Sequence, residues 1–222
     1  AKTSLNIPSG FWERQGVIRN GKAFERFGEG LRLIADRKSD AGLTAVNEAA
    51  GIEPDSRDLH YFLGSYYALQ QFNYERAVYH LEKVTNKNPD DSRAHYRLGF
   101  TFYLQGNYDA ALKSFERART LSPLNIETAL MLAACYEDTG NYDAVVENYR
   151  IALRQAPRRA AIWYSLASTL SMKGDQQQAV DALRRALEID RDSFYDLAKS
   201  DADLAPIRKT REYRELMEKF KK

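Results

Sequence analysis

Residues 95–123, which read HYRLGFTFYLQGNYDAALKSFERARTLSP, decide the fold because their landmark residues recur along the chain at a fixed interval. The glycine at position 106 returns twice, and each copy lies 34 residues after the one before it. Leucine, alanine and proline landmarks keep the same interval. A shared period at four independent positions indicates a tandem structural repeat. The four series are Gly106, Gly140 and Gly174; Leu98, Leu132 and Leu166; Ala118, Ala152 and Ala186; and Pro89, Pro123 and Pro157.

Each repeat is predicted to contain two helices. His95, Leu98 and Phe102 are spaced so that they share one face of a helix. Gly106 favours the end of that helix, and the side chain of Asn107 can cap the start of the next one. The equivalent capping residues in the other units are Asn73, Asn141 and Asp175. Pro123 then disfavours helical geometry in the residue before it, so the second helix ends there. The pattern predicts an all-α protein.

The same residues resemble the tetratricopeptide repeat (TPR) family, whose pattern is W-x-x-L-G-x-x-Y…A-x-x-x-F…P. The unit quoted above matches it with His95, Leu98, Gly99, Phe102, Ala111, Phe115 and Pro123. A later unit supplies the tryptophan itself, Trp163. The resemblance implies a right-handed superhelical array, or α-solenoid, of helix-turn-helix units.

The expected organisation follows from the period. The four clear units occupy residues 57–91, 92–125, 126–159 and 160–193, and the first of them carries an extra residue in the turn at Gln70-Gln71-Phe72. Residues 23–56 are interpreted as a degenerate leading repeat whose first helix Gly28 and Gly30 weaken. We expect residues 1–22 to be partly irregular, with Phe11 and Trp12 able to dock on the first repeat. Capping helices are predicted over residues 194–222.

Composition excludes several classes of function. Lys and Arg number 33 against 31 Asp and Glu, so no strong basic field points to nucleic acid. No apolar run approaches the roughly 20 residues that span a bilayer, so no direct membrane insertion is expected. The single cysteine, Cys135, cannot form an intramolecular disulfide and leaves the compartment open, with the cytoplasm as the default. Because the chain begins at Ala1, the sequence is also compatible with a removed signal or anchor.

No residue pattern predicts catalysis, a cofactor or a metal. His60 and His95 occupy the position that Trp163 fills in its own unit, so they are interpreted as packing residues. His80 stands alone, and none of the histidines shows the spacing of metal ligands. The chain is therefore predicted not to be an enzyme.

The resemblance implies that a partner binds on the concave face, which the first helix of each unit lines. Counting from the small residue of each first helix gives the positions opposite the packing stripe, and several hold large aromatic groups. An alternative is that these rings pack against the facing helix or the N-terminal segment. The candidate groove residues are Tyr61, Phe62, Arg93, Tyr96, Arg97, Phe100, Tyr103, Met131 and Tyr164.

The predicted function is a protein–protein interaction module or assembly adaptor that binds a peptide segment. The partner is expected to be apolar or aromatic with an acidic group, because Arg93 and Arg97 accompany the rings. The alternative is a self-associating structural scaffold, that is, a homo-oligomer. Less expected is a co-chaperone that binds a chaperone's C-terminal tail, since Phe62 stands where that clamp requires Asn.

Overall fold

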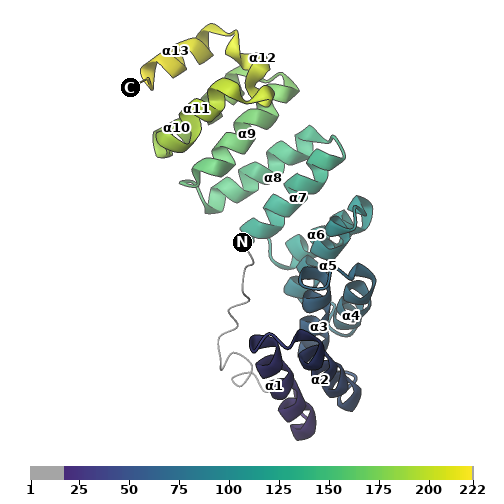
Figure 1. Ribbon diagram of the computed structural model, residues 1–222. Coiled ribbons are helices and arrows are strands. Elements are labelled where there is room, and N and C mark those ends of the chain that lie inside the picture. The colour runs from purple at the N-terminus through teal and green to yellow at the C-terminus, as the bar shows by residue number, and fades with distance from the viewer. Residues whose placement is uncertain (1–17, 222) are drawn as a thin grey trace. The chain divides into compact units, whose positions relative to one another are not determined.

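The computed structural model describes residues 18–221, and every regular element in that range is a helix (Figure 1). The chain divides into two compact units on either side of the Gln105–Gly106 bond, and each unit is described by itself. The division falls at the turn inside the repeat predicted for residues 92–125. Phe11 and Trp12 lie outside the described residues.

The first unit contains five helices within its described residues, and consecutive helices pack against each other. Their bounds agree with the two-helix reading of each repeat. They are α1 (Gly21–Ala35), α2 (Ser39–Ile52), α3 (Arg57–Leu69), α4 (Tyr74–Lys87) and α5 (Ser92–Leu104).

The second unit continues the pattern and ends in shorter helices. Two-helix pairs are again the repeating element, with α7 packed on α8 and α9 on α10. Its elements within the described residues are α6 (Tyr108–Leu121), α7 (Ile126–Asp138), α8 (Tyr142–Gln155), α9 (Ala160–Lys173), α10 (Gln176–Ile189), α11 (Arg191–Ser200), the 3-10 turn η1 (Ala202–Leu204), α12 (Ala205–Arg208) and α13 (Arg211–Lys219).

Glycines let the helices of a pair approach closely. A Cβ atom on Gly64 of α3 would lie 2.5 Å from Cγ of Leu81 on α4. A Cβ atom on Gly30 of α1 would lie 2.8 Å from the carbonyl oxygen of Gly42 on α2. The cost of Gly30 to helix propensity is therefore offset by a backbone contact that no other residue permits.

The turns within the repeats use left-handed backbone at one fixed position. Gly106, Gly140 and Gly174 have φ angles of 74°, 75° and 90°. Phe72 occupies the same position in the first clear unit with a φ of 53° and is 68% exposed. The turn hydrogen bond spans six residues there, from Asn73 N to Tyr67 O at 2.9 Å, whereas it spans five from Asn141 N to Tyr136 O and from Asp175 N to Leu170 O. This confirms the predicted extra residue.

Asparagine caps three of the second helices, as predicted. The Oδ1 atoms of Asn73, Asn107 and Asn141 each accept from the backbone N–H three residues later, at 3.1–3.3 Å. The prediction for Asp175 was wrong. Its side chain makes no cap hydrogen bond to α10 and instead accepts from Lys173 Nζ at 2.8 Å, because the lysine charge attracts the carboxylate.

This difference predicts unequal effects of two similar substitutions. Asn141→Ala should lower the free energy of unfolding by about 1 kcal/mol, because it leaves an α8 backbone N–H without its acceptor. Asp175→Ala removes one partly exposed ion pair, with Lys173, and should cost less than about 0.5 kcal/mol. Urea denaturation of the two variants checks this, and equal losses would contradict the assignment of the caps.

The packing position shared by His60, His95 and Trp163 has a second role. Each ring donates an N–H to the carbonyl of the proline six residues earlier, at 2.8, 3.0 and 2.9 Å respectively. The loop carbonyl before each first helix is thereby satisfied. The interpretation of His60 and His95 as structural residues agrees with this geometry.

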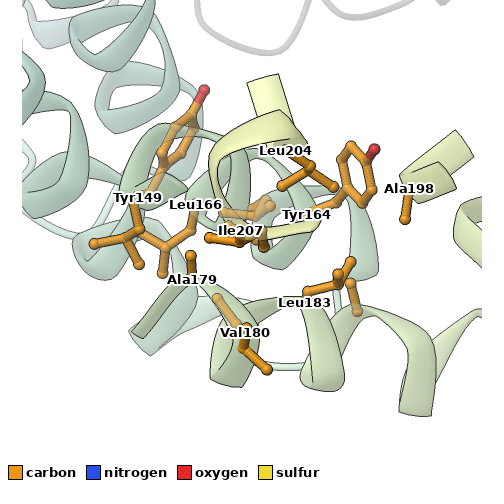
Figure 2. Close-up of a cluster of buried hydrophobic side chains, with 14 of the residues drawn as sticks. Tyr149, Tyr164, Leu166, Ala179, Val180, Leu183, Ala198, Leu204 and Ile207 are labelled. Carbon is orange, nitrogen blue, oxygen red and sulfur yellow. The ribbon is translucent and has the colours of Figure 1, made fainter. Parts of the chain in front are cut away.

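The C-terminal elements cover the last repeat pair. The side chains of Leu204 and Ile207 are fully buried in one cluster with Leu183 of α10 and Tyr164 of α9 (Figure 2). Tyr213 of α13 joins the cluster, and its hydroxyl donates to the carbonyl of Ala198 at 2.8 Å. These contacts bury the apolar face that the final pair would otherwise present to water.

Candidate functional site

Aromatic rings and arginines share one stripe of α5, as the sequence predicts. The rings of Tyr96 and Phe100 stack with centroids 6.5 Å apart and planes at 11°. Both rings are half-buried, as is Tyr103 one turn further along. Large apolar groups held at partial exposure are typical of surfaces that bind protein.

Two arginines border these rings. Arg93 is exposed, and Arg97 is half-buried with its Nε atom enclosed and lacking a hydrogen-bond partner within the described part of the chain. The exposed side chain of Arg93 and the half-buried side chain of Arg97 give the stripe positive charge beside its rings, which favours an acidic group.

An ion network fixes the start of α5 relative to α3. Arg57 Nε donates to Asp91 Oδ2 at 2.7 Å, and Arg57 Nη1 donates to Asp58 Oδ1 at 2.8 Å. Asp91 also caps α5, since its Oδ1 accepts from Arg93 N and Ala94 N at 3.1 Å each. Burial raises the pKa of Asp58, and the positive charges of Arg57 and Arg93 oppose that rise. The network holds the start of α5 against α3, because Arg57 binds the carboxylates of both Asp58 and Asp91.

The structure places Phe62 in the core of the first unit. The ring is 7% exposed, meets Phe27 edge-to-face at 5.3 Å and stacks on Tyr66 at 5.8 Å. Tyr61, the neighbouring candidate on α3, is half-buried. The open aromatic surface of this unit is therefore carried mainly by α5.

The two candidate groove residues in the second unit also differ in how much of the side chain is exposed. Met131 of α7 is half-buried. Tyr164 of α9 is 7% exposed, because its ring stacks on Phe194 at 4.8 Å and its hydroxyl donates to Asp201 Oδ2 at 2.7 Å. Burial and that hydrogen bond raise the pKa of Tyr164. Tyr164 anchors the C-terminal helices to α9.

Sequence reasoning missed a histidine pair between α3 and α4. The Nδ1 atoms of His60 and His80 are 2.8 Å apart, and His80 stacks on Tyr67. A carbonyl only accepts, so His60 Nε2 carries a proton for Pro54 and His60 Nδ1 accepts from His80. The residues lie 20 apart in sequence, a distance unrelated to the repeat period.

This pair predicts an acid-sensitive contribution to stability. Burial, the neighbouring His60, and the charges of Lys83 and Arg76 lower the pKa of His80 from 6.5 to about 4. The pKa of His60 is also lowered, mainly by burial and with opposing contributions from Asp55 and the Pro54 carbonyl. A depressed folded-state pKa means that stability is complete above pH 6.5 and is lost as the pH falls toward 4.

Between pH 7 and pH 4.5, the parent should lose about 2 kcal/mol more unfolding free energy than His80→Gln, allowing for solvent screening. Urea denaturation at the two pH values measures this difference. Parallel losses in the two proteins would show that the pair does not titrate on unfolding.

The cysteine and the possible metal ligands among residues 18–221 can be described individually. Cys135 is fully buried, and burial together with Asp138 raises the pKa of its thiol to about 12, which disfavours the nucleophilic thiolate. In that range no three His, Cys, Asp or Glu side chains are grouped so that they could hold a metal ion. None of the described helices combines the length and apolar character that a membrane span requires.

Paired helices, glycine turns and a half-buried aromatic stripe define a helical-repeat protein of the interaction-module class. The family model described as "Tetratricopeptide repeat" matches residues 125–192, and "Anaphase-promoting complex, cyclosome, subunit 3" matches residues 70–152. The chain belongs to the tetratricopeptide repeat family. No curated protein sequence matches it.

Solved structures with the same fold include "Crystal structure of MamA protein", with a TM-score of 0.71 and 20% identity over 81% of this chain and 96% of that one. "MamA 41-end from Desulfovibrio magneticus RS-1" has a TM-score of 0.69 and 22% identity over 78% and 97%. "Crystal structure of YrrB: a TPR protein with an unusual peptide-binding site" has 0.66 and 19% over 81% and 92%. At these identities the likeness is one of fold.

Proposed function

We propose that the protein is a non-catalytic adaptor that binds an extended peptide segment of a partner protein along the first helices of its repeats. The contact surface proposed in the first unit is the α5 stripe of Tyr96, Phe100 and Tyr103 with Arg93 and Arg97. Apolar or aromatic side chains of the peptide would pack on the rings, and an acidic group would meet the arginines.

The observation that supports this proposal best is the combination of stacked, half-exposed rings with the side chains of Arg93 and Arg97 on the same helix stripe. A helix that only needed to be soluble would carry charged residues there. One structure with this fold, YrrB, is described as having a peptide-binding site, which supports the same class of function.

Affinity capture with the whole immobilised chain, followed by mass spectrometry, would identify the partner. A parallel column would carry the double variant Arg93→Glu/Arg97→Glu, which reverses the charge beside the rings. Proteins retained by the parent and lost from the variant, with retention that weakens as salt rises, would support the proposal. Equal retention on both columns would count against an acidic partner segment.

Light scattering coupled to size-exclusion chromatography addresses the alternative of a self-associating scaffold. The proposal expects a mass that stays constant with concentration in the absence of partner. Oligomers that grow with concentration, and that Tyr96→Ala/Phe100→Ala leaves unchanged, would favour the scaffold instead.

A further inference from the structure

A pocket of about 520 Å³ lies in the second unit, where α8, α9 and α10 meet. Its floor consists of the buried side chains of Leu153, Leu166 and Leu170. Trp163 forms one wall, half-buried, and its indole N–H donates to the Pro157 carbonyl at 2.9 Å, which fixes the ring. The leucine side chains of this floor offer no hydrogen-bonding atoms, so the group that fits there is hydrocarbon.

Arginines surround this apolar floor. Arg150 Nη2 donates to Gln178 at 2.7 Å, and Arg185 pairs with Glu188 at 3.0 Å on the surface, a contact that is readily exchanged. Arg154 is exposed and has no hydrogen bond or ion pair within residues 18–221.

The rim is therefore positive. Its one carboxylate, Asp181, already accepts from Arg184 at 2.6 Å. An exposed arginine with no acceptor beside an apolar hollow favours a ligand that brings carboxylates with it.

A pocket beside the corresponding residue of the first unit, at the loop end of α3 and α4, has a different character. There His60 replaces Trp163, and the smaller pocket of about 350 Å³ is lined mainly by polar groups. Two of its three cations are matched by carboxylates, since Lys87 pairs with Asp55 at 2.9 Å and Arg57 with Asp91, and the third, Lys83, lies over the ring of Tyr79. An aromatic wall with uncompensated arginines is therefore not a general consequence of the repeat.

We infer that the Trp163 pocket binds an acidic peptide segment that inserts one aromatic side chain against Leu166 and Leu170, while its carboxylates meet Arg154 and Arg185. The pocket uses the face of α9 that carries Trp163, whereas Tyr164 and Ser168 face Asp201 of the C-terminal segment. It is thus distinct from the groove on the first helices. A nucleotide base fits less well, because its polar edge would find no partner on the leucine floor.

The test uses the full chain and a fluorescein-labelled peptide, acetyl-Glu-Glu-Phe-Asp-Glu, read by fluorescence anisotropy. In a Trp12→Phe background Trp163 is the only tryptophan, since the sequence contains two, so its emission reports occupancy of this pocket. We expect saturable binding together with a change in that emission. Replacement of the peptide's phenylalanine by alanine, or of its acids by amides, should weaken binding about tenfold or more.

Two variants of the protein locate the contact. Arg154→Glu and Trp163→Ala should each weaken binding about tenfold or more. Alanine is a natural occupant of this position in the repeat over residues 126–159, where it is Ala129, so Trp163→Ala is expected to fold. Arg158→Glu is the matched control, because it makes the same charge change on an exposed arginine outside the pocket and should alter binding less than about threefold.

Failure of the parent to bind the peptide would overturn the inference, as would unchanged binding by Arg154→Glu and Trp163→Ala. Tighter binding of adenosine triphosphate than of the peptide at Trp163 would also overturn it. Tyr96→Ala/Phe100→Ala should leave the binding that Trp163 emission reports unchanged, which separates the pocket from the proposed groove.

Discussion

Gly64→Leu should lower the free energy of unfolding of the first unit by about 3 kcal/mol, since α3 and α4 are packed around the missing side chain. A Cβ atom at this position would lie 2.5 Å from Leu81 Cγ and 3.2 Å from the Ala77 carbonyl oxygen. Leu81 and Ala77 are themselves fully buried, so neither can move away without displacing its neighbours. Urea denaturation followed by the helical circular dichroism signal measures the loss.

Gly28→Leu is the matched control. Gly28 lies inside α1, and a Cβ atom there would meet nothing within 4 Å. The substitution should stabilise the helix by about 0.5–1 kcal/mol, because glycine is a poor helix former. A similar loss at both positions would show that the close approach of α3 and α4 is not what Gly64 provides.

Tyr96→Ala/Phe100→Ala should weaken binding of a captured partner segment by about 2–4 kcal/mol, since each aromatic truncation at a contact centre costs about 1–3 kcal/mol and stacked neighbours are not additive. The rings stack on each other at 6.5 Å, so removing both is needed to clear the stripe. Helicity should be retained, because neither ring belongs to the clusters of buried core residues. Isothermal titration calorimetry with the partner segment measures the change.

Tyr79→Ala supplies the matched control within the same unit. Tyr79 lies on α4, is 54% exposed and has Lys83 Nζ 4.9 Å from its ring centroid, so it is also an aromatic residue beside a cation. Its loss should leave the dissociation constant of the partner segment unchanged. Equal weakening by both variants would indicate general destabilisation of the unit.

Most of the fold follows from the sequence because the repeat period fixes which residues share a helix face. The period predicted the turn glycines, the extra residue before Asn73 and the asparagine caps. Asp175 departed from its equivalents because Lys173, two residues before it, competes for its carboxylate. That competition depends on side chains outside the repeat pattern.

The candidate site was less predictable, because the period says which face a residue occupies and not what covers that face. Phe62 and Tyr164 lie on the expected stripe, yet Phe27 of the leading helix and the C-terminal segment bearing Asp201 cover them. Both covering elements belong to the irregular ends of the chain, where no period predicts contacts. The His60–His80 pair was missed for a different reason: it lies within one regular repeat, and only the packing of α3 on α4 brings the two rings together.

Site-specific photo-cross-linking tests the central claim most directly. Benzoylphenylalanine would replace Phe100 on the proposed α5 surface in one protein and Tyr79 on α4 in another, each mixed with the captured partner and irradiated. The account predicts a partner adduct from position 100, mapped to an aromatic, acidic segment of the partner, and none from position 79. Adducts from position 79 and none from position 100 would place the binding surface away from α5 and contradict the proposed function.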